Sequence, residues 1–452
     1  MSTPYFNMLT INDNQSKNAV VVAPSNLTPS QFYNKADFQC NWSNDTAQIQ
    51  AAIDFLRHST EDLESINYSQ GTVYLLPGYY NITGPITLYT SIEVVGMGMW
   101  ETKLILRNSN ACFTSDNFSS YVRLANITID GGDPAGTGYG VTGAFKQSTF
   151  ERIRMVNMKK SAFKFYPANF GDGLLNIIQY NDINVTGNNN DAFAMDFNEK
   201  NYDTWIINNN VGSVKPNLRI SGGPFRILGN HFNGSTASAD QPENNIVTEL
   251  GLNSCVISNN IIENAKKDAI ILKRVFNSDP GLTNNNINIS NNLIRSENLD
   301  ANGQYSMVKF INGGQNFKGV TFIGNLFEQR FKTGQPQNKY KNALELNYVE
   351  NVVVSANVFA LDNANFPLIG IGNNTEDIQI LANAGYDFLN VVKNNFTVRG
   401  SRIEITDSDT IQSSTAGGFP GQIAWDENYL YVCISDSHWR RIPLPKEDWD
   451  PS

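Results

Sequence analysis

A repeat with a nearly constant period constrains this chain more than any other feature. Five segments share the pattern apolar–x–apolar–x–x–Asn–x–apolar, and the steps between their asparagines are 30, 32, 33 and 32 residues. These asparagines are Asn230, Asn260, Asn292, Asn325 and Asn357. Each segment begins with the period-two alternation of a strand and lacks helical periodicity. A constant period of this size predicts stacked supersecondary units, and one coil of a parallel β-helix fits each unit.

The repeated asparagine has a physical reason. Asparagine tolerates the left-handed backbone region, and its amide bonds backbone groups at a sharp corner. Equivalent residues of neighbouring coils lie about 4.8 Å apart, so we expect an asparagine ladder. Weaker copies of the pattern end at Asn188 and near Asn157. The 42-residue step from Asn188 to Asn230 predicts an inserted loop near residues 198–216.

A second column of short strands supports the repeat. Each strand begins with a small or polar residue, and its third and fifth residues are apolar, so we expect these two to face the core. The strands are residues 161–166, 191–196, 268–273, 306–311 and 342–347. In this alignment Phe163 stacks on Phe193, and Phe165 stacks on Met195.

Composition excludes several classes of function. The formal net charge of −10 argues against a nucleic-acid partner, and the low charged fraction of 17% fits a neutral or weakly charged carbohydrate. The four cysteines are far apart, so no zinc site or disulfide framework is predicted, although Cys112 and Cys255 are expected to be buried thiols. The sequence predicts no metal site and no cofactor.

The chain divides into three parts by pattern. Residues 1–42 read as an N-terminal arm, although Val20–Val22 could form a strand. Residues 43–412 hold the coils, and residues 413–452 follow a Gly-rich and Ser-rich linker and predict a β-hairpin with exposed aromatic residues. Asp45 is a plausible N-cap for a short helix that covers the first coil. No signal follows Met1 and no apolar segment of about 18 residues exists, which predicts synthesis in a reducing cytoplasm and no membrane insertion.

Three N-terminal segments carry a family resemblance. The segments DTAQIQAAIDFL, GTVYLLPGYYNITGPITL and IEVVGMGMWETKLIL resemble the N-terminal cap and first coils of the pectate-lyase-like superfamily. That superfamily includes polygalacturonase-type enzymes and many bacteriophage tailspikes. The resemblance implies an all-β chain that folds as a right-handed parallel β-helix with a small C-terminal β tail. The usual YGAKGDG lead-in is absent, and Phe38–Trp42 stands in its place.

Three carboxylates are the candidate catalytic residues. If residues 244–249 form the matching strand, Glu249 lies between Asp196 and Lys273, and Asn244 lies between Asp191 and Asp268. Carboxyl groups on neighbouring coils would then be about 5 Å apart, or about twice that across two coils, and these separations bracket retaining and inverting glycoside hydrolysis. Two close carboxylates also raise one pKa. The predicted catalytic residues are therefore Asp196, Glu249 and Asp268.

Several other side chains are candidates for substrate binding. Asp191 belongs to the same lateral columns, and Lys273 and Arg274 could bind an acidic sugar. The expected inserted loop would bring Tyr202 and Trp205 beside Asp196. Aromatic side chains could stack on sugar rings, although in a solenoid they more often pack at corners. The aromatic candidates are Tyr166, Tyr202, Trp205 and Tyr348.

The first hypothesis is a phage tailspike that binds and depolymerises a bacterial surface polysaccharide by glycoside hydrolysis. The tailspike resemblance implies a homotrimer, attachment to a phage tail or adaptor protein through the N-terminal arm, and a place in the virion after synthesis in the host cytoplasm. A non-enzymatic adhesion or structural rod with the same fold is the second hypothesis. A polysaccharide lyase and a free pectin- or uronate-processing enzyme remain open, because Lys, Arg or His can abstract a proton next to a uronate.

Overall fold

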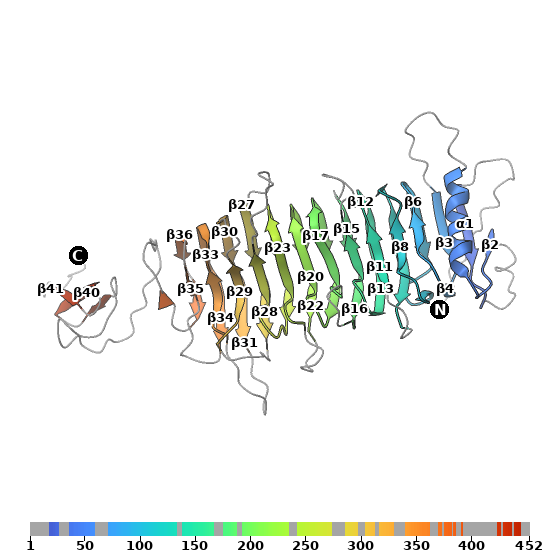
Figure 1. Ribbon diagram of the computed structural model, residues 1–452. Helices are drawn as coiled ribbons and strands as arrows, with labels where there is room; N and C mark the ends of the chain where they lie inside the picture. Colours follow the sequence, from blue (N-terminus) through green and yellow to red (C-terminus); the bar gives the residue numbers. More distant parts are fainter. Residues whose placement is uncertain are drawn as a thin grey trace, which may run out of the picture. The chain divides into compact units, whose positions relative to one another are not determined.

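The chain forms two compact units, residues 1–399 and residues 400–452. The computed structural model describes the ranges 18–26, 36–58, 71–132, 138–166, 175–187, 192–234, 242–273, 285–296, 303–311, 316–329, 340–361, 369–372, 375–381, 383–385, 390–391, 423–425, 428–435 and 438–443. Within the first unit, parallel strands stack coil upon coil (Figure 1). The expected right-handed parallel β-helix is confirmed.

One side of the solenoid is a parallel sheet of twelve strands among the described residues, here called the twelve-strand sheet. It consists of β5 (Ile86–Leu88), β8 (Ala111–Ser115), β11 (Tyr139–Gly143), β14 (Phe163–Phe165), β17 (Met195–Asn201), β20 (Leu218–Gly222), β23 (Ile246–Leu252), β26 (Ile270–Lys273), β29 (Ser306–Ile311), β32 (Asn342–Leu346), β35 (Ile369–Ile371) and β38 (Asn390–Val391).

The remaining coil strands form two parallel ladders that share β10 (Arg123–Asp130) and β13 (Thr149–Met158). The first ladder also contains β1 (Ala19–Ala23), β2 (Phe38–Gln39), β3 (Gly71–Leu75), β6 (Ile92–Gly96), β15 (Ile177–Gln179), β18 (Thr204–Ile207), β21 (Phe225–Leu228), β24 (Val256–Ser258), β27 (Asn285–Ser290), β30 (Phe317–Ile323), β33 (Val349–Ser355) and β36 (Glu376–Leu381). The second ladder also contains β4 (Gly78–Ile82), β7 (Thr102–Leu106), β16 (Asp182–Val185), β19 (Asn210–Ser213), β22 (His231–Asn233), β25 (Ile261–Glu263), β28 (Leu293–Ser296), β31 (Leu326–Gln329), β34 (Val358–Leu361) and β37 (Ala384–Gly385). A short pair, β9 (Ser119–Ser120) and β12 (Phe145–Lys146), lies outside these sheets.

The predicted asparagine ladder lies at the corner where each coil turns from a strand of the first ladder to a strand of the second. Each backbone N–H and one Nδ2–H of a ladder asparagine donate to the Oδ1 of the next one, as those of Asn230 do to Asn260 at 2.8 and 3.0 Å. The other Nδ2–H bonds the carbonyl of an earlier coil, as that of Asn260 does to Ile227 at 2.9 Å. The ladder extends the five predicted members in both directions: it consists of Asn181, Asn209, Asn230, Asn260, Asn292, Asn325, Asn357 and Asn383.

One detail of this corner differs from the expectation. The left-handed backbone belongs to the residue before each ladder position, because this residue makes the turn, while the ladder asparagines from Asn181 to Asn357 are at most 2% exposed. The residues that precede ladder asparagines and have this backbone are Tyr180, Asn208, Gly229, Asn259, Asn291, Gly324 and Ala356.

The predicted inserted loop near residues 198–216 is also wrong. Those residues contain β18 and β19, a full coil with Asn209 in the ladder, and the ladder position before it is Asn181 rather than Asn188. These two coils escaped the pattern because Asn176 and Thr204 stand where it requires an apolar residue. Both are fully buried, and the Asn176 amide bonds the Phe145 carbonyl.

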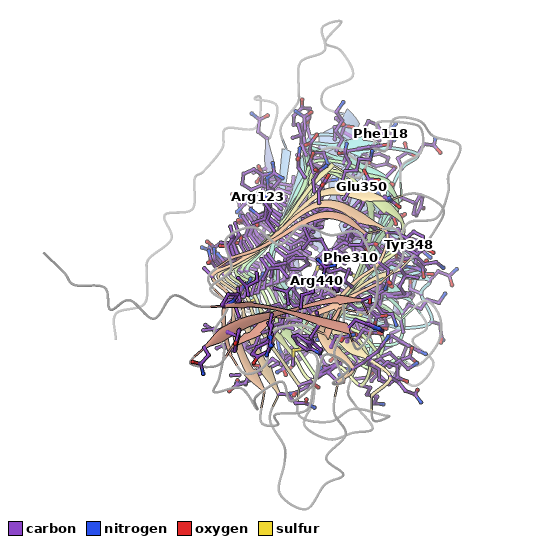
Figure 2. The ribbon with its side chains drawn as sticks, turned by 90° about the vertical axis from the view of Figure 1, so that its left-hand side faces the viewer. Phe118, Arg123, Phe310, Tyr348, Glu350 and Arg440 are labelled. Atoms are coloured by element: carbon purple, nitrogen blue, oxygen red, sulfur yellow. The ribbon has the colours of Figure 1, made fainter. Side chains whose placement is uncertain are left out.

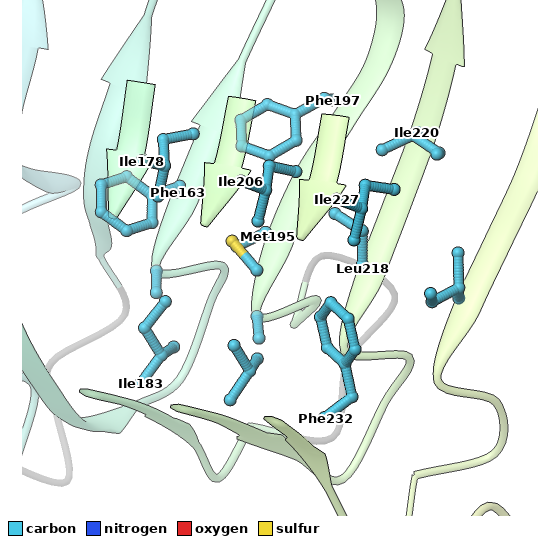
Figure 3. Packing of buried hydrophobic residues seen from close by; sticks show 14 of the residues in the cluster. Phe163, Ile178, Ile183, Met195, Phe197, Ile206, Leu218, Ile220, Ile227 and Phe232 are labelled. Atoms are coloured by element: carbon cyan, nitrogen blue, oxygen red, sulfur yellow. The ribbon is translucent and has the colours of Figure 1, made fainter. Parts of the chain in front are cut away.

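The interior is filled by side chains that stack from coil to coil. Figure 3 shows one such column, in which Phe163, Met195 and Leu218 follow one another on successive strands. In the view along the stack in Figure 2, Phe310 lies inside the coil, and it is fully buried. Cys112 and Cys255 lie in this core as expected, and burial raises the pKa of the Cys255 thiol to about 12.

The helix α1 (Asp45–His58) packs against β1, β3, β4 and β5 at one end of the coils (Figure 1). Its apolar residues Ile49, Ala52, Ile53 and Leu56 are buried, so the helix covers the first coil as predicted. The N-cap contact comes from Asn44, whose Oδ1 accepts the Ala47 N–H at 3.3 Å, rather than from Asp45. Within the described part of the chain, no helix has both the length and the apolarity that crossing a bilayer requires.

Both ends of the predicted coil region show extra structure. β1, which falls within the expected arm, pairs with β3 in the first ladder. In the second unit, the predicted hairpin consists of β40 (Tyr429–Ser435) and β41 (His438–Pro443), and β39 (Ile423–Trp425) adds a third antiparallel strand. Trp439, expected to be exposed, is buried with Tyr431 and Cys433 in the small core of this unit.

Candidate active site

The outer face of the twelve-strand sheet carries the side chains of one continuous column. Strand register places these residues opposite each other on successive coils, between two columns that point into the core. This outer column consists of Thr87, Thr114, Thr142, Lys164, Asp196, Arg219, Val247, Ile271, Lys309, Glu345 and Gly370. Charged residues gather in two places along it.

The first charged group, called the Arg219 cluster, joins two of the predicted catalytic residues. The Arg219 guanidinium binds Asp196 through two hydrogen bonds of 2.9 and 2.7 Å, and its third nitrogen lies 3.5 Å from Glu249. Asn198 donates to the same Glu249 oxygen at 3.2 Å. The Asp196 side chain is 2% exposed and that of Glu249 is 47% exposed. Arg219 also stacks on Phe193, 3.9 Å from the ring centroid.

The expected alignment of Asp196 with Glu249 is therefore wrong. Phe163 pairs with Met195 rather than with Phe193, so residues 191–196 are shifted by two positions. Asp196 consequently pairs with Arg219 on the next coil, and Arg219 pairs with Val247 on the coil after that. A shift of the strand register by two residues keeps every apolar side chain facing inward. The alternation of apolar and polar residues therefore cannot exclude such a shift. The Arg219 guanidinium lies between the carboxylates of Asp196 and Glu249, where the glycosidic bond would have to lie during hydrolysis.

The second group, called the Glu345 cluster, contains the third predicted catalytic residue. Ser306 connects two carboxylates: its backbone N–H donates to Asp268 at 2.6 Å, and its hydroxyl donates to Glu345 at 2.8 Å. Glu345 also lies 3.5 Å from the Lys309 ammonium and 3.1 Å from that of Lys341. Asp268 and Glu345 are 5% and 8% exposed. Three successive coils, those of β26, β29 and β32, thus contribute to one polar centre.

The environments of these two carboxylates move their pKa values in opposite directions. Burial raises the pKa of Asp268, and the nearby Glu345 charge adds to this, although the Ser306 N–H and Lys309 oppose it. Burial also acts to raise the pKa of Glu345, but the Ser306 hydroxyl and the two lysines outweigh it, so the pKa lies below its usual range. A raised pKa favours the protonated form of Asp268 and a lowered pKa favours the ionised form of Glu345, and these are the forms of a general acid and a general base.

A hollow of about 290 Å³ opens at the other end of the outer column, on β8, β11 and β14. It is called the Tyr139 hollow, and it is lined by Pro85, Asn110, Ala111, Thr114, Tyr139, Thr142, Lys164 and Tyr166. The Lys164 ammonium lies 3.3 Å from the Tyr139 hydroxyl. Tyr166, a stacking candidate from the sequence, is 39% exposed here.

None of the other predicted binding residues that the structure describes lies in the outer column. Lys273 lies at the exposed end of β26, where its backbone N–H donates to the hydroxyl of Thr248, the residue before Glu249. Trp205 is 43% exposed on β18 in the first ladder, a different sheet from Asp196. Tyr202 precedes that strand, so neither aromatic residue lies in the outer column. Asp191 and Arg274 lie outside the described residues.

Sequence reasoning missed several residues of this face. Glu345 and Lys309 lie at outward positions of strands that the sequence pattern predicts, so their shared column is the signal that identifies them. Arg219 has no such signal, because the sequence pattern does not predict β20 as a strand. Among the described residues, no group of three or more His, Cys, Asp or Glu side chains could hold a metal ion.

Comparisons with known proteins identify the fold. No family model matches the chain, and no curated protein does. The lidless DFA-IIIase from Arthrobacter chlorophenolicus A6 superposes with a TM-score of 0.62 at 13% identity, over 84% of this chain and 99% of that chain. A point mutant of the same enzyme in complex with DFA-III gives 0.61 at 12%, over 84% and 99%. The A-module of the Azotobacter vinelandii mannuronan C-5 epimerase AlgE6 gives 0.47 at 17%, over 79% and 95%.

Proposed function

We propose that this chain binds a polysaccharide along the outer face of the twelve-strand sheet and depolymerises it by glycoside hydrolysis at the Glu345 cluster. The carrying observation is that Ser306 joins two buried carboxylates whose pKa values are shifted in opposite directions, that of Asp268 upward and that of Glu345 downward. The fold also supports an enzyme, since the DFA-IIIase with this fold has been solved in complex with DFA-III and with GF2. A bacterial surface polysaccharide is the proposed substrate class.

Each carboxylate has a role that its environment favours. Asp268, whose raised pKa favours its protonated form, donates a proton to the leaving oxygen as the glycosidic C–O bond breaks. Glu345, which is ionised, takes a proton from the water that supplies the new hydroxyl group. Lys309 and Lys341 hold Glu345 in its charged form through their ion pairs. The Ser306 side chain fixes the orientation of the Glu345 carboxylate.

The Arg219 cluster has a binding role in this proposal. Its bidentate contact engages both oxygens of Asp196, so in this proposal Asp196 orients the Arg219 guanidinium rather than transferring a proton. The half-exposed Glu249 can accept hydrogen bonds from sugar hydroxyl groups. The predicted catalytic function of Asp196 and Glu249 thus becomes a binding function, while Asp268 keeps its predicted catalytic function.

The test is a product assay with purified bacterial surface polysaccharides and the full chain. Hydrolysis releases new reducing ends without ultraviolet absorbance, whereas a lyase also forms an absorbing unsaturated uronate. Binding without either product would support the non-enzymatic rod instead. An unsaturated product would contradict the assignment of Asp268 and Glu345 as acid and base.

We expect a bell-shaped dependence of turnover on pH. Activity requires ionised Glu345, whose pKa lies below its ordinary 4.5, and protonated Asp268, whose pKa lies above its ordinary 3.8. The rate therefore rises as pH increases through the pKa of Glu345 and falls as pH increases through the pKa of Asp268. Initial rates measured from acidic to alkaline pH give this profile. A rate that still increases above neutral pH would contradict the assignment.

A homotrimeric phage tailspike is the finer form of this proposal. Its specific support, beside the N-terminal resemblance, is the second unit, in which Ile434 and Ile442 are each 52% exposed. In a tailspike these residues would pack between copies, and the N-terminal arm would bind the phage tail or its adaptor protein in the virion.

We expect the full chain to have a native mass of about three times 50.2 kDa by light scattering. Ile434→Lys combined with Ile442→Lys should release monomers, because two charges would be buried without partners. Ile323→Lys, at a site that is 40% exposed on β30, is the matched control and should stay trimeric. A monomeric wild-type chain would remove the trimer from the proposal.

A further inference from the structure

The Tyr139 hollow lies on the same outer face as the Glu345 cluster but belongs to a different set of coils. Its floor comes from β8 and β11, which lie next to each other near the α1 end of the stack (Figure 1). Lys164 on β14 is the member of the outer column that pairs with Asp196 on the following coil. The hollow is therefore continuous with the Arg219 cluster along one row of side chains.

The lining is cationic and aromatic although the chain as a whole carries a formal net charge of −10. None of the eight lining residues is acidic. Two ammonium groups flank the Tyr139 ring, that of Lys160 at 4.7 Å and that of Lys164 at 5.1 Å from its centroid. Thr114, Thr142 and Asn110 add neutral hydrogen-bonding groups. A positively charged hollow on an acidic protein selects an anionic ligand.

The size and shape of the hollow limit the ligand further. Its volume of about 290 Å³ is at the lower end of ligand pockets, which suits one or two sugar rings rather than a longer segment. The exposed Tyr166 ring offers an apolar surface on which the face of a sugar ring can pack. The threonine and asparagine side chains match sugar hydroxyl groups.

We propose that the Tyr139 hollow is a binding subsite for a sugar unit that carries a carboxylate, with Lys164 pairing with this carboxylate and Tyr166 packing against the ring. This inference rests on the proposed function and specifies its substrate class as an acidic polysaccharide. From β14 to β29 the outer column crosses five coil steps, or about 24 Å at about 4.8 Å per step, so only an oligomer of several units reaches both the hollow and the Glu345 cluster.

The test measures binding by calorimetry with the full chain at neutral pH. The probes are uronate hexasaccharides (galacturonate, glucuronate, mannuronate and guluronate) and the same hexasaccharides with each carboxyl group reduced to an alcohol. Lys164→Gln should weaken binding of the preferred uronate about tenfold or more, because a charge-assisted contact is lost, and should change binding of its reduced counterpart about twofold or less. Tyr166→Ala should weaken binding of both.

Lys103→Gln is the matched control. Lys103 also lies over a tyrosine ring, 5.4 Å from the centroid of Tyr79, but on β7 in the second ladder. This variant should bind uronates as the wild type does, and thermal unfolding of all three variants checks that they fold.

The outcomes separate the two proposals. The subsite is supported if the wild type binds a uronate more strongly than its reduced counterpart, and if Lys164→Gln loses this preference while Lys103→Gln keeps it. Equal binding of both probes by the wild type, or an unchanged uronate affinity in Lys164→Gln, overturns the subsite and leaves the proposed function standing. A wild-type chain that binds neither these probes nor bacterial surface polysaccharides contradicts the proposed function and the subsite together.

Discussion

Asn260→Leu is expected to lower the free energy of unfolding by about 3–6 kcal/mol, because two or three buried polar groups would lose their partners at about 1–3 kcal/mol each. The Asn260 Oδ1 accepts the backbone N–H and the Nδ2–H of Asn230, and its own Nδ2 donates to Ile227 and Asn292. Leucine can replace none of these bonds. Since Asn260 is 1% exposed, water cannot replace them either.

Thermal and urea unfolding of the full chain measure this loss. Asn210→Leu is the matched control, since Asn210 is exposed, lies one residue from the ladder, and donates its side-chain N–H to Asp182 at the surface. Its expected change is within about 0.5 kcal/mol, as for other surface substitutions. If both variants unfold alike, the ladder contributes little to the stability of the coils.

Glu345→Gln is expected to lower kcat about 10²–10⁴-fold, the contribution of one general acid or base. Glutamine keeps the size of the side chain and can still accept the Ser306 hydroxyl, but it cannot take a proton from water. Asp268→Asn should cause a loss of similar size, because its amide cannot donate a proton to the leaving oxygen. The measurement is the initial rate of reducing-end release at the optimal pH.

Glu350→Gln provides the matched control for Glu345→Gln. Glu350 also pairs with a lysine, at 3.0 Å from Lys318, and burial is likewise outweighed there by Lys318 and Asn316, so its pKa is also lowered. It lies on β33 in the first ladder, away from the outer column, and its variant should keep wild-type kcat. If Glu345→Gln keeps full turnover and Asp196→Asn loses it, the assignment of catalysis to the Glu345 cluster is wrong and the reaction belongs to the Arg219 cluster.

The sequence was sufficient to predict the solenoid and the asparagine ladder. Every coil turns the same corner and must provide hydrogen-bond partners for the same buried backbone groups. The same residue, asparagine, therefore recurs in each repeat. The prediction missed the coils of Asn181 and Asn209, where Asn176 and Thr204 interrupt the apolar pattern. A buried position that finds a hydrogen-bond partner, as Asn176 does, need not be apolar, and no periodicity reveals that partner.

For the candidate active-site face, the sequence predicted less than it did for the solenoid. Alternation was enough to place Asp196 and Glu345 on the outside of their strands. It could not decide which outward residues become neighbours, because a shift of two residues leaves the same side chains inside. Only the folded coils placed Arg219 between Asp196 and Glu249, and Ser306 between Asp268 and Glu345. The period of a strand specifies which way a side chain points, whereas the residue it meets depends on the lengths of the turns between coils.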